Sequence, residues 1–114
     1  MQRGDIVYIQ MTEGVGSEIG GLDCRPAIIV SNDAANRFSP VIEVVYLTTR
    51  RKKNLPTHVF IKSSPKPSTA TCEQVSSVSK QRIYQSVGAV TQREMEQIDQ
   101  ALRISLGLEE RSTP

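Results

Sequence analysis

Residues 16–30 read GSEIGGLDCRPAIIV, a polar, glycine-rich stretch that runs directly into a short apolar segment. The glycines let a backbone bend closely around a ligand, and the apolar run at 27–30 predicts a buried strand that forms a rigid platform. Arg25 at the junction can hold a phosphate through paired N–H donors. The stretch therefore indicates chemistry on a phosphate backbone, while a polar hairpin connection with a solvated arginine is the alternative interpretation.

Short β-like runs cover most of the remaining chain. Strands are expected at residues 6–11, 27–31, 41–48, 58–62, 71–75 and 86–90. In the first of them Val7, Ile9 and Met11 form one fully apolar face. Two prolines within residues 63–69 would remove ladder donors, so this segment is predicted to be a loop. The loops at 12–24 and 50–54 are the candidates for function.

One helix is predicted near the C-terminus. Thr91 and Glu94 form a T-x-x-E capping box, and apolar residues follow at helical spacing until Gly107 ends the pattern: Met95, Ile98, Leu102 and Leu106. The apolar stripe fits packing against a sheet. Many short strands with one packed helix predict a mainly β fold, a small and strongly bent, barrel-like sheet.

Composition limits the kind of protein this is. The 114 residues, 38% of them hydrophobic, predict one domain, expected over residues 1–108, with a polar tail at 109–114. A net charge of +2 is too small to hold duplex DNA by charge alone, so any nucleic-acid site must be local. Basic residues do cluster at 50–53 and 80–82. The N-terminus has no apolar stretch of signal-peptide or membrane-spanning length, and a cytoplasmic protein is expected.

Motifs throughout the chain resemble, in order, the MazF/PemK family of toxin endoribonucleases, and most closely the MazF toxins of Gram-positive bacteria. They are RGDIVY (3–8), GSE (16–18), GG (20–21), RPAIIV (25–30), SND (31–33), NRFSP (36–40), LT (47–48), LPTHV (55–59), EQV (73–75), KQR (80–82) and ALRISLGL (101–108). The resemblance implies a two-fold homodimer of SH3-like barrels of the MazF/CcdB type. It also implies metal-independent, cofactor-free cleavage of single-stranded RNA, and inhibition by a cognate MazE-like antitoxin whose tail occupies the RNA groove.

The resemblance assigns catalysis to Arg25 and Thr48, with Glu18 as a third participant. In such chemistry the ribose 2′-OH attacks the adjacent phosphorus and expels the 5′-oxygen, which leaves a 2′,3′-cyclic phosphate and a 5′-hydroxyl. Arg25 would stabilise the added negative charge, and Thr48 would bond a non-bridging oxygen or orient the 2′-OH. Because an arginine stays protonated in proteins, Glu18 is the better candidate for the general base. A salt bridge with Arg25 is the alternative role for Glu18, so the identity of the base stays open.

RNA binding is expected to use local charge and hydrogen bonds to splayed bases. The groove residues predicted from the sequence are Ser17, Arg50, Arg51, Lys52, Lys53, Gln74, Ser76, Ser77, Lys80 and Arg82. A solvated loop is the alternative for the basic run at 50–53. With only two phenylalanines and three tyrosines, extensive base stacking is not expected. Phe38 and the tyrosines are assigned to the core or a dimer interface, with Tyr46 near the site.

The lone His58 and the two cysteines suggest less. Cys24 and Cys72 lie far apart without CxxC spacing, so neither a zinc site nor a disulfide is implied. His58 is given a structural or RNA-lining role. A thiol enzyme using Cys24 with His58 is a third choice, because no oxyanion motif accompanies it.

Three departures from the family pattern and two alternative functions complete the analysis. The segment at residues 63–71 is short and contains prolines where relatives have a longer segment. The family commonly has glutamine where this chain has Ile19, and the spacing to Arg25 is longer through residues 22–24. The cleaved sequence therefore cannot be read from the chain, nor can the identity of the antitoxin. One alternative is a non-catalytic CcdB-like toxin that poisons DNA gyrase by binding, and another is a catalytically dead paralogue. The presence of both Arg25 and Thr48 favours the ribonuclease.

Overall fold

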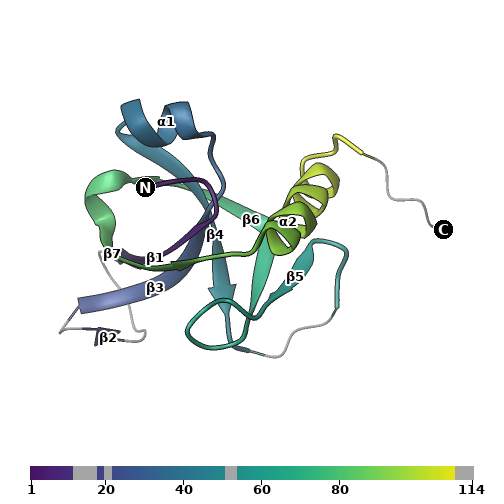
Figure 1. The fold of residues 1–114 in the computed structure, drawn as a ribbon, viewed down its shortest axis with the longest axis horizontal. Coiled ribbons are helices and arrows are strands. Elements are labelled where there is room, and N and C mark those ends of the chain that lie inside the picture. The colour runs from purple at the N-terminus through teal and green to yellow at the C-terminus, as the bar shows by residue number, and fades with distance from the viewer. Residues whose placement is uncertain (12–17, 20–21, 51–53, 110–114) are drawn as a thin grey trace.

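One bent antiparallel sheet and a C-terminal helix make up the computed structural model, which describes residues 1–11, 18–19, 22–50 and 54–109 (Figure 1). The elements in chain order are β1 (Asp5–Gln10), β2 (Glu18–Ile19), β3 (Leu22–Ile29), α1 (Asp33–Phe38), β4 (Val41–Thr48), β5 (His58–Ile61), β6 (Ser68–Ser79), the 3₁₀-helix η1 (Lys80–Arg82), β7 (Ile83–Ala89) and α2 (Gln92–Ser105). The prediction of a mainly β, barrel-like fold with a C-terminal helix is confirmed.

The strands follow the order β5-β6-β4-β3-β1-β7, and β2 adds a short hairpin to β3. The N-terminal strand β1 therefore lies inside the sheet, between β3 and β7. In the pairing of β4 with β6, the register shifts between Val45 and Leu47, so that residues 71–74 of β6 lie opposite Tyr46 alone. Such a bulge bends the strand and increases its twist, which helps the sheet to curl (Figure 1).

Both faces of the central strands are buried. One face carries Ile28, Val45 and Ile61, which pack against Ile98 of α2. The opposite face carries a second apolar cluster that includes Val7, Ile9, Ala27, Val44 and Tyr46. Because successive residues of a strand point to opposite faces, a strand buried on both sides reads as a continuous apolar run, as residues 27–30 do.

Helix α2 begins with the predicted capping box. Thr91 Oγ1 accepts a hydrogen bond from the Glu94 amide (3.1 Å), and the Glu94 carboxylate accepts one from the Thr91 amide (2.9 Å). Glu94 also accepts from the Lys62 amide (2.8 Å) and the Ser63 hydroxyl (2.6 Å), which fastens α2 to the end of β5. After the helix, Gly107 has φ = +75°, a conformation that favours glycine.

Four features differ from the sequence predictions. Helix α1 was not expected: Asn32 caps it by accepting from the Ala35 amide (2.8 Å), but six residues are too few to show a helical period. Strand β6 extends well beyond 71–75, and β2 with the start of β3 falls inside the predicted loop 12–24. Phe38, assigned to the core or a dimer interface, does not lie in the core, because it ends α1 with 77% of its surface exposed, and its place in a dimer interface stays a prediction. No helix among the described residues is long and apolar enough to cross a membrane.

Candidate active site

The pairing of β3 with β4 brings Arg25 and Thr48 to the same end and face of the sheet. Ala27 pairs with Tyr46, and from that pair each strand continues two residues, to Arg25 in β3 and to Thr48 in β4. Since every second residue of a strand lies on the same face, all four share one face. The two residues assigned to catalysis are 23 positions apart in the sequence and lie on neighbouring strands in the structure.

Tyr46 lies beneath the arginine. Tyr46 is 7% exposed, and the guanidinium carbon of Arg25 lies 4.6 Å from the centre of its ring. A cation over the face of a tyrosine is held by the ring quadrupole, and the guanidinium edges are left to donate to a bidentate acceptor. Arg25 is itself exposed, and no described carboxylate forms an ion pair with it. The arrangement suits an incoming phosphate.

Thr48 is half-buried at the end of β4. Its Oγ1 accepts a hydrogen bond from the Arg50 amide (3.2 Å), which fixes the hydroxyl oxygen and leaves its proton to be donated elsewhere. Arg50 is exposed two residues further on. A donor and a cation therefore follow one another where β4 ends.

The backbone of Glu18 pairs with Asp23, which lies two residues before Arg25 in β3. This hairpin holds the Glu18 backbone beside the strand that carries Arg25. Four further predicted site residues lie outside the described residues: Ser17, Arg51, Lys52 and Lys53.

Arg82 reaches the Arg25 region from across β1. Its Nε donates to the Gln10 carbonyl (2.9 Å), and Gln10 pairs with Cys24. Arg82 is half-buried and packs beside Met11. A second guanidinium thus lies one strand away from the residues that flank Arg25.

The structure separates the remaining predicted groove residues. Ser76 pairs with Val44 and shares the face of Tyr46, and Gln74 is exposed in the bulge of β6. Ser77 lies on the other face, where its hydroxyl donates to the Glu43 carboxylate (2.7 Å). Lys80 donates its amide to the Pro40 carbonyl (2.9 Å), at the opposite end of β4 from Thr48.

A polar cluster that the sequence analysis did not assemble lies on β5 and β6. His58 Nε2 is 3.0 Å from Glu73 Oε2, and the Thr57 hydroxyl donates to Glu73 Oε1 (2.8 Å). Burial raises the pKa of Glu73, but the hydrogen bonds from His58, its own backbone and Thr57 outweigh it, so the net pKa lies below its ordinary value. Thr71, which pairs with His58, donates to the Tyr46 carbonyl (3.1 Å), so this cluster adjoins the Arg25 face.

The thiols are poorly suited to catalysis. Cys24 and Cys72 are both free and fully buried. Burial, and then the charge of Asp23, raise the pKa of Cys24, and burial raises that of Cys72 to about 12. Since the thiolate is the nucleophile, this disfavours a thiol enzyme. Among the described residues no three His, Cys, Asp or Glu side chains are grouped to hold a metal ion.

Comparisons with known proteins agree with this fold. The model of a family described as a PemK-like, MazF-like toxin of type II toxin–antitoxin systems matches residues 2–106. The chain is 36% identical to endoribonuclease EndoA of Bacillus subtilis, over 95% of this chain and 96% of that protein. It is 35% identical to endoribonuclease MazF of Staphylococcus saprophyticus, over 95% of this chain and 92% of the relative.

Solved structures share the architecture. A mycobacterial endoribonuclease in complex with its cognate antitoxin superposes with a TM-score of 0.81 at 28% identity, covering 97% of this chain and 99% of the other. A MazE–MazF structure from Deinococcus radiodurans gives a TM-score of 0.75 at 19% identity, covering 94% and 95% of the two chains, and at that identity supports the fold alone.

Proposed function

Because this chain belongs to the PemK-like, MazF-like family of toxins of type II toxin–antitoxin systems, we propose that it is an endoribonuclease that cleaves single-stranded RNA at short sequences. The relatives that share most of its length are named as endoribonucleases. We place its activity in the cytoplasm, where messenger RNA is available.

The observation that carries the proposal is the placement of Arg25 in β3 beside Thr48 at the end of β4, on one face, with the Arg25 guanidinium over the Tyr46 ring. A scissile phosphate bound by the guanidinium edge of Arg25 would lie within reach of the Thr48 hydroxyl. Attack by the ribose 2′-OH adds negative charge to the phosphorane, and fixed donors aimed at that charge lower the barrier. Arg25 supplies charge without changing its protonation, and Thr48 supplies one neutral donor.

Proton transfer from the 2′-OH is assigned to Glu18. The proposal is supported by the backbone pairing of Glu18 with Asp23, which lies two residues before Arg25 in β3. The alternative role for Glu18, a salt bridge that holds Arg25 in place, predicts a loss of substrate binding rather than a changed pH dependence of the rate. The reaction leaves a 2′,3′-cyclic phosphate and a 5′-hydroxyl and requires no metal in this proposal.

The RNA strand is proposed to run over the Arg25 face. Arg50 beyond Thr48 and Arg82 beyond β1 flank that face and would hold neighbouring phosphates. Gln74 and Ser76 on β6 would contact bases. The loops at 12–24 and 50–54 are proposed to supply further RNA contacts, from Ser17, Arg51, Lys52 and Lys53. Ser77 and Lys80 would contact RNA only if the RNA extends along β6.

Partners follow from the same family membership. We infer a homodimer and a cognate MazE-like antitoxin that covers the RNA groove. A relative of this fold has been solved with its cognate antitoxin, at 28% identity over almost the whole chain. The gyrase-poison alternative is not favoured, because every relative named above is an endoribonuclease or a MazF protein.

Purified protein and its Arg25→Ala variant should be incubated with a long single-stranded RNA in EDTA, and the new 5′ ends mapped by primer extension. We expect discrete cuts by the wild type alone, with 5′-hydroxyl ends. Loss of one charge-stabilising donor typically lowers the rate by about 10²–10³-fold. Absence of cutting by folded wild-type protein would contradict the proposal and favour the gyrase-poison or dead-paralogue alternatives.

A further inference from the structure

A groove runs along the outer edge of β5, beside α2. It encloses about 720 Å³, and its walls include Phe60 and Lys62 of the strand side and Arg93, Gln97 and Gln100 of the helix. These helix residues recur at spacings of three and four, so they form one stripe along α2. The groove is thus bounded by a strand edge on one side and by a helix on the other.

The backbone at this edge of β5 points into the groove. β5 is the end strand of the sheet and pairs only with β6 among the described residues. The Cys72 amide donates to the Thr57 carbonyl (2.9 Å), so the backbone N–H and C=O groups of residue 57 point toward β6. Because hydrogen-bonded pairs alternate along an antiparallel ladder, the backbone groups of residues 59 and 61 also point toward β6, and those of residues 58, 60 and 62 point away from it. Two further bonds agree: the His58 amide is held by the Leu55 carbonyl (2.9 Å) and the Lys62 amide by Glu94 (2.8 Å).

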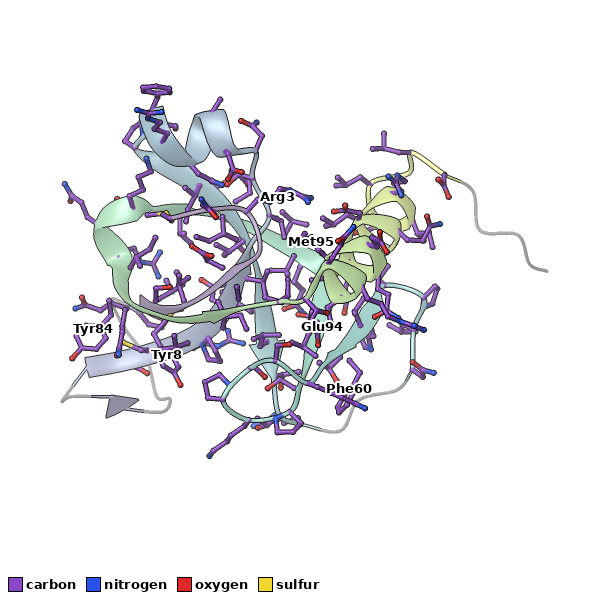
Figure 2. The ribbon with its side chains drawn as sticks, in the orientation of Figure 1. Arg3, Tyr8, Phe60, Tyr84, Glu94 and Met95 are labelled. Atoms are coloured by element: carbon purple, nitrogen blue, oxygen red, sulfur yellow. The ribbon has the colours of Figure 1, made fainter. Side chains whose placement is uncertain are left out.

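The edge is capped at one end and open in the middle. Glu94 accepts hydrogen bonds from the amides of Lys62 and Ser63, and Figure 2 shows it at the first turn of α2. Between that cap and the 55–58 turn, three backbone groups point away from β6: the amide and the carbonyl of Phe60 and the carbonyl of His58. Unpaired backbone groups at a strand edge are a template for another strand. A residue of an extended peptide opposite Phe60 would exchange two hydrogen bonds with it.

Charge and apolar surface define what such a peptide should be. Lys62 and Arg93 are both exposed at the Glu94 end of the groove, and neither forms an ion pair with a described residue. The nearby Glu94 carboxylate is occupied by hydrogen bonds from residues 62, 63 and 91. Phe60 is 57% exposed on the side of β5 away from α2 (Figure 2), where it can pack against an apolar side chain.

We propose that this groove binds an extended acidic peptide segment of a partner protein, which adds a short strand to β5 and lies against α2. Strand addition takes its affinity from backbone hydrogen bonds and its selectivity from side chains. β5 spans about 13 Å, which matches a peptide of about four residues. Carboxylates of the peptide would approach Lys62 and Arg93, and one apolar side chain would cover Phe60. The proposal does not depend on RNA cleavage, because Arg25, Tyr46 and Thr48 do not line the groove.

The full-length protein should be titrated with the peptide acetyl-Glu-Glu-Val-Glu-Glu-amide, whose central valine would pair with Phe60, and followed by NMR. We expect the amide of Phe60 to shift and its hydrogen exchange to slow, together with shifts at Gln97 and Gln100. The same peptide N-methylated at its central valine, which loses one backbone donor, and the peptide acetyl-Lys-Lys-Val-Lys-Lys-amide should both bind more weakly.

The matched variants are the double substitution Lys62→Gln/Arg93→Gln and the control Lys66→Gln, an exposed lysine that does not line the groove. Exposed ion pairs are individually weak, so the double variant should lose about threefold to tenfold in affinity, and the control should lose none. Equal binding by all three proteins, shifts at Tyr46 instead of Phe60, or no binding would overturn the proposal. Shifts at Phe60 that grow with protein concentration alone would assign the edge to a second copy and also overturn it. The RNA cleavage assay on the same variants should be unchanged, which separates this test from that of the proposed function.

Discussion

The guanidinium of Arg25 in β3 lies 4.6 Å from the ring centre of Tyr46 in β4, on the sheet face that also carries Thr48. A long, exposed side chain loses conformational entropy when a ligand fixes it in one position. The contact with the Tyr46 ring already restricts the Arg25 side chain, so less entropy is lost when a ligand binds. Pre-placing a cation in this way favours binding in one geometry.

Replacement of Tyr46 should reveal this positioning. Tyr46→Phe keeps the aromatic face, so cleavage should stay within about twofold, whereas Tyr46→Leu removes a contact of about 1 kcal/mol and should slow cleavage about fivefold. Cleavage rates at saturating RNA measure the effect, and thermal melts check that both variants fold. Equal rates for the two variants would show that the ring does not position Arg25.

Thr48→Val should abolish most activity without disturbing the fold. Valine has the shape of threonine but lacks the hydroxyl donor, and loss of one such donor costs about 10²-fold in rate. Thr48→Ser retains the hydroxyl and serves as the matched control. RNA binding measured in parallel should change little in either variant, and a Val variant as active as the Ser variant would remove Thr48 from catalysis.

Removal of the Glu94 side chain from α2 should strongly destabilise the fold. Its buried carboxylate accepts hydrogen bonds from residues 62, 63 and 91, so Glu94→Ala leaves several donors without partners and should cost about 2–4 kcal/mol in free energy of unfolding. The exposed neighbour Glu96 provides the control, since Glu96→Ala should cost less than about 0.5 kcal/mol. Urea unfolding at one fixed protein concentration measures both, and similar midpoints would contradict the assignment.

Acid should destabilise the protein through the same carboxylate. Burial raises the pKa of Glu94, but the hydrogen bonds from Ser63, Thr91 and Lys62 together lower it by more than burial raises it. The net pKa of Glu94 in the folded state therefore lies below the ordinary 4.5. A depressed carboxyl pKa contributes stability that is present above the ordinary value and is lost as the pH falls through the folded value. Glu73 shifts in the same direction.

Melting temperatures measured between about pH 7 and about pH 3 should therefore fall most steeply below pH 4.5, the ordinary glutamate value. The Glu94→Gln variant, which does not titrate, should start lower and lose less over that range. Parallel curves for the two proteins would contradict this assignment.

The thiols should be inert while the fold is intact. Cys24 and Cys72 are fully buried with raised pKa values, and a protonated, inaccessible thiol reacts slowly with disulfide reagents. Ellman's reagent should detect almost no thiol in the native protein and both thiols in denaturant. Fast reaction of either one at neutral pH would show that the surrounding core opens readily.

Features with strong local signals were predictable from the sequence. The capping box at Thr91 and Glu94 begins α2 as expected, and β4 has the predicted bounds 41–48, because both signals lie within a few neighbouring residues. Helix α1 was missed because its signal is a single cap at Asn32 and one turn and a half of helix. The proximity of His58 to Glu73 depends on the pairing of β5 with β6 and on the bulge of β6, which no local pattern encodes.

The candidate site divides in the same way. The resemblance to a known family identified Arg25 and Thr48. Only the register of β3 and β4 shows that these two residues lie on the same face of the sheet and near the same end of it. Ser77 and Lys80 illustrate the limit: they lie close in sequence to Ser76 and Arg82, but alternation of strand faces and the length of β4 place them elsewhere.

Arg3 joins the beginning of the chain to its end. Its amide donates to Asp33 (2.7 Å), its Nε to the Val30 carbonyl (2.9 Å) and its Nη2 to Asp99 of α2 (2.7 Å), while β1 behind it pairs with β7. A ribosome must therefore have released almost the whole polypeptide before its first strand acquires both neighbours and its anchor on the last helix. Long-range closure of this kind slows folding. A newly made chain therefore completes its sheet only some time after its synthesis ends.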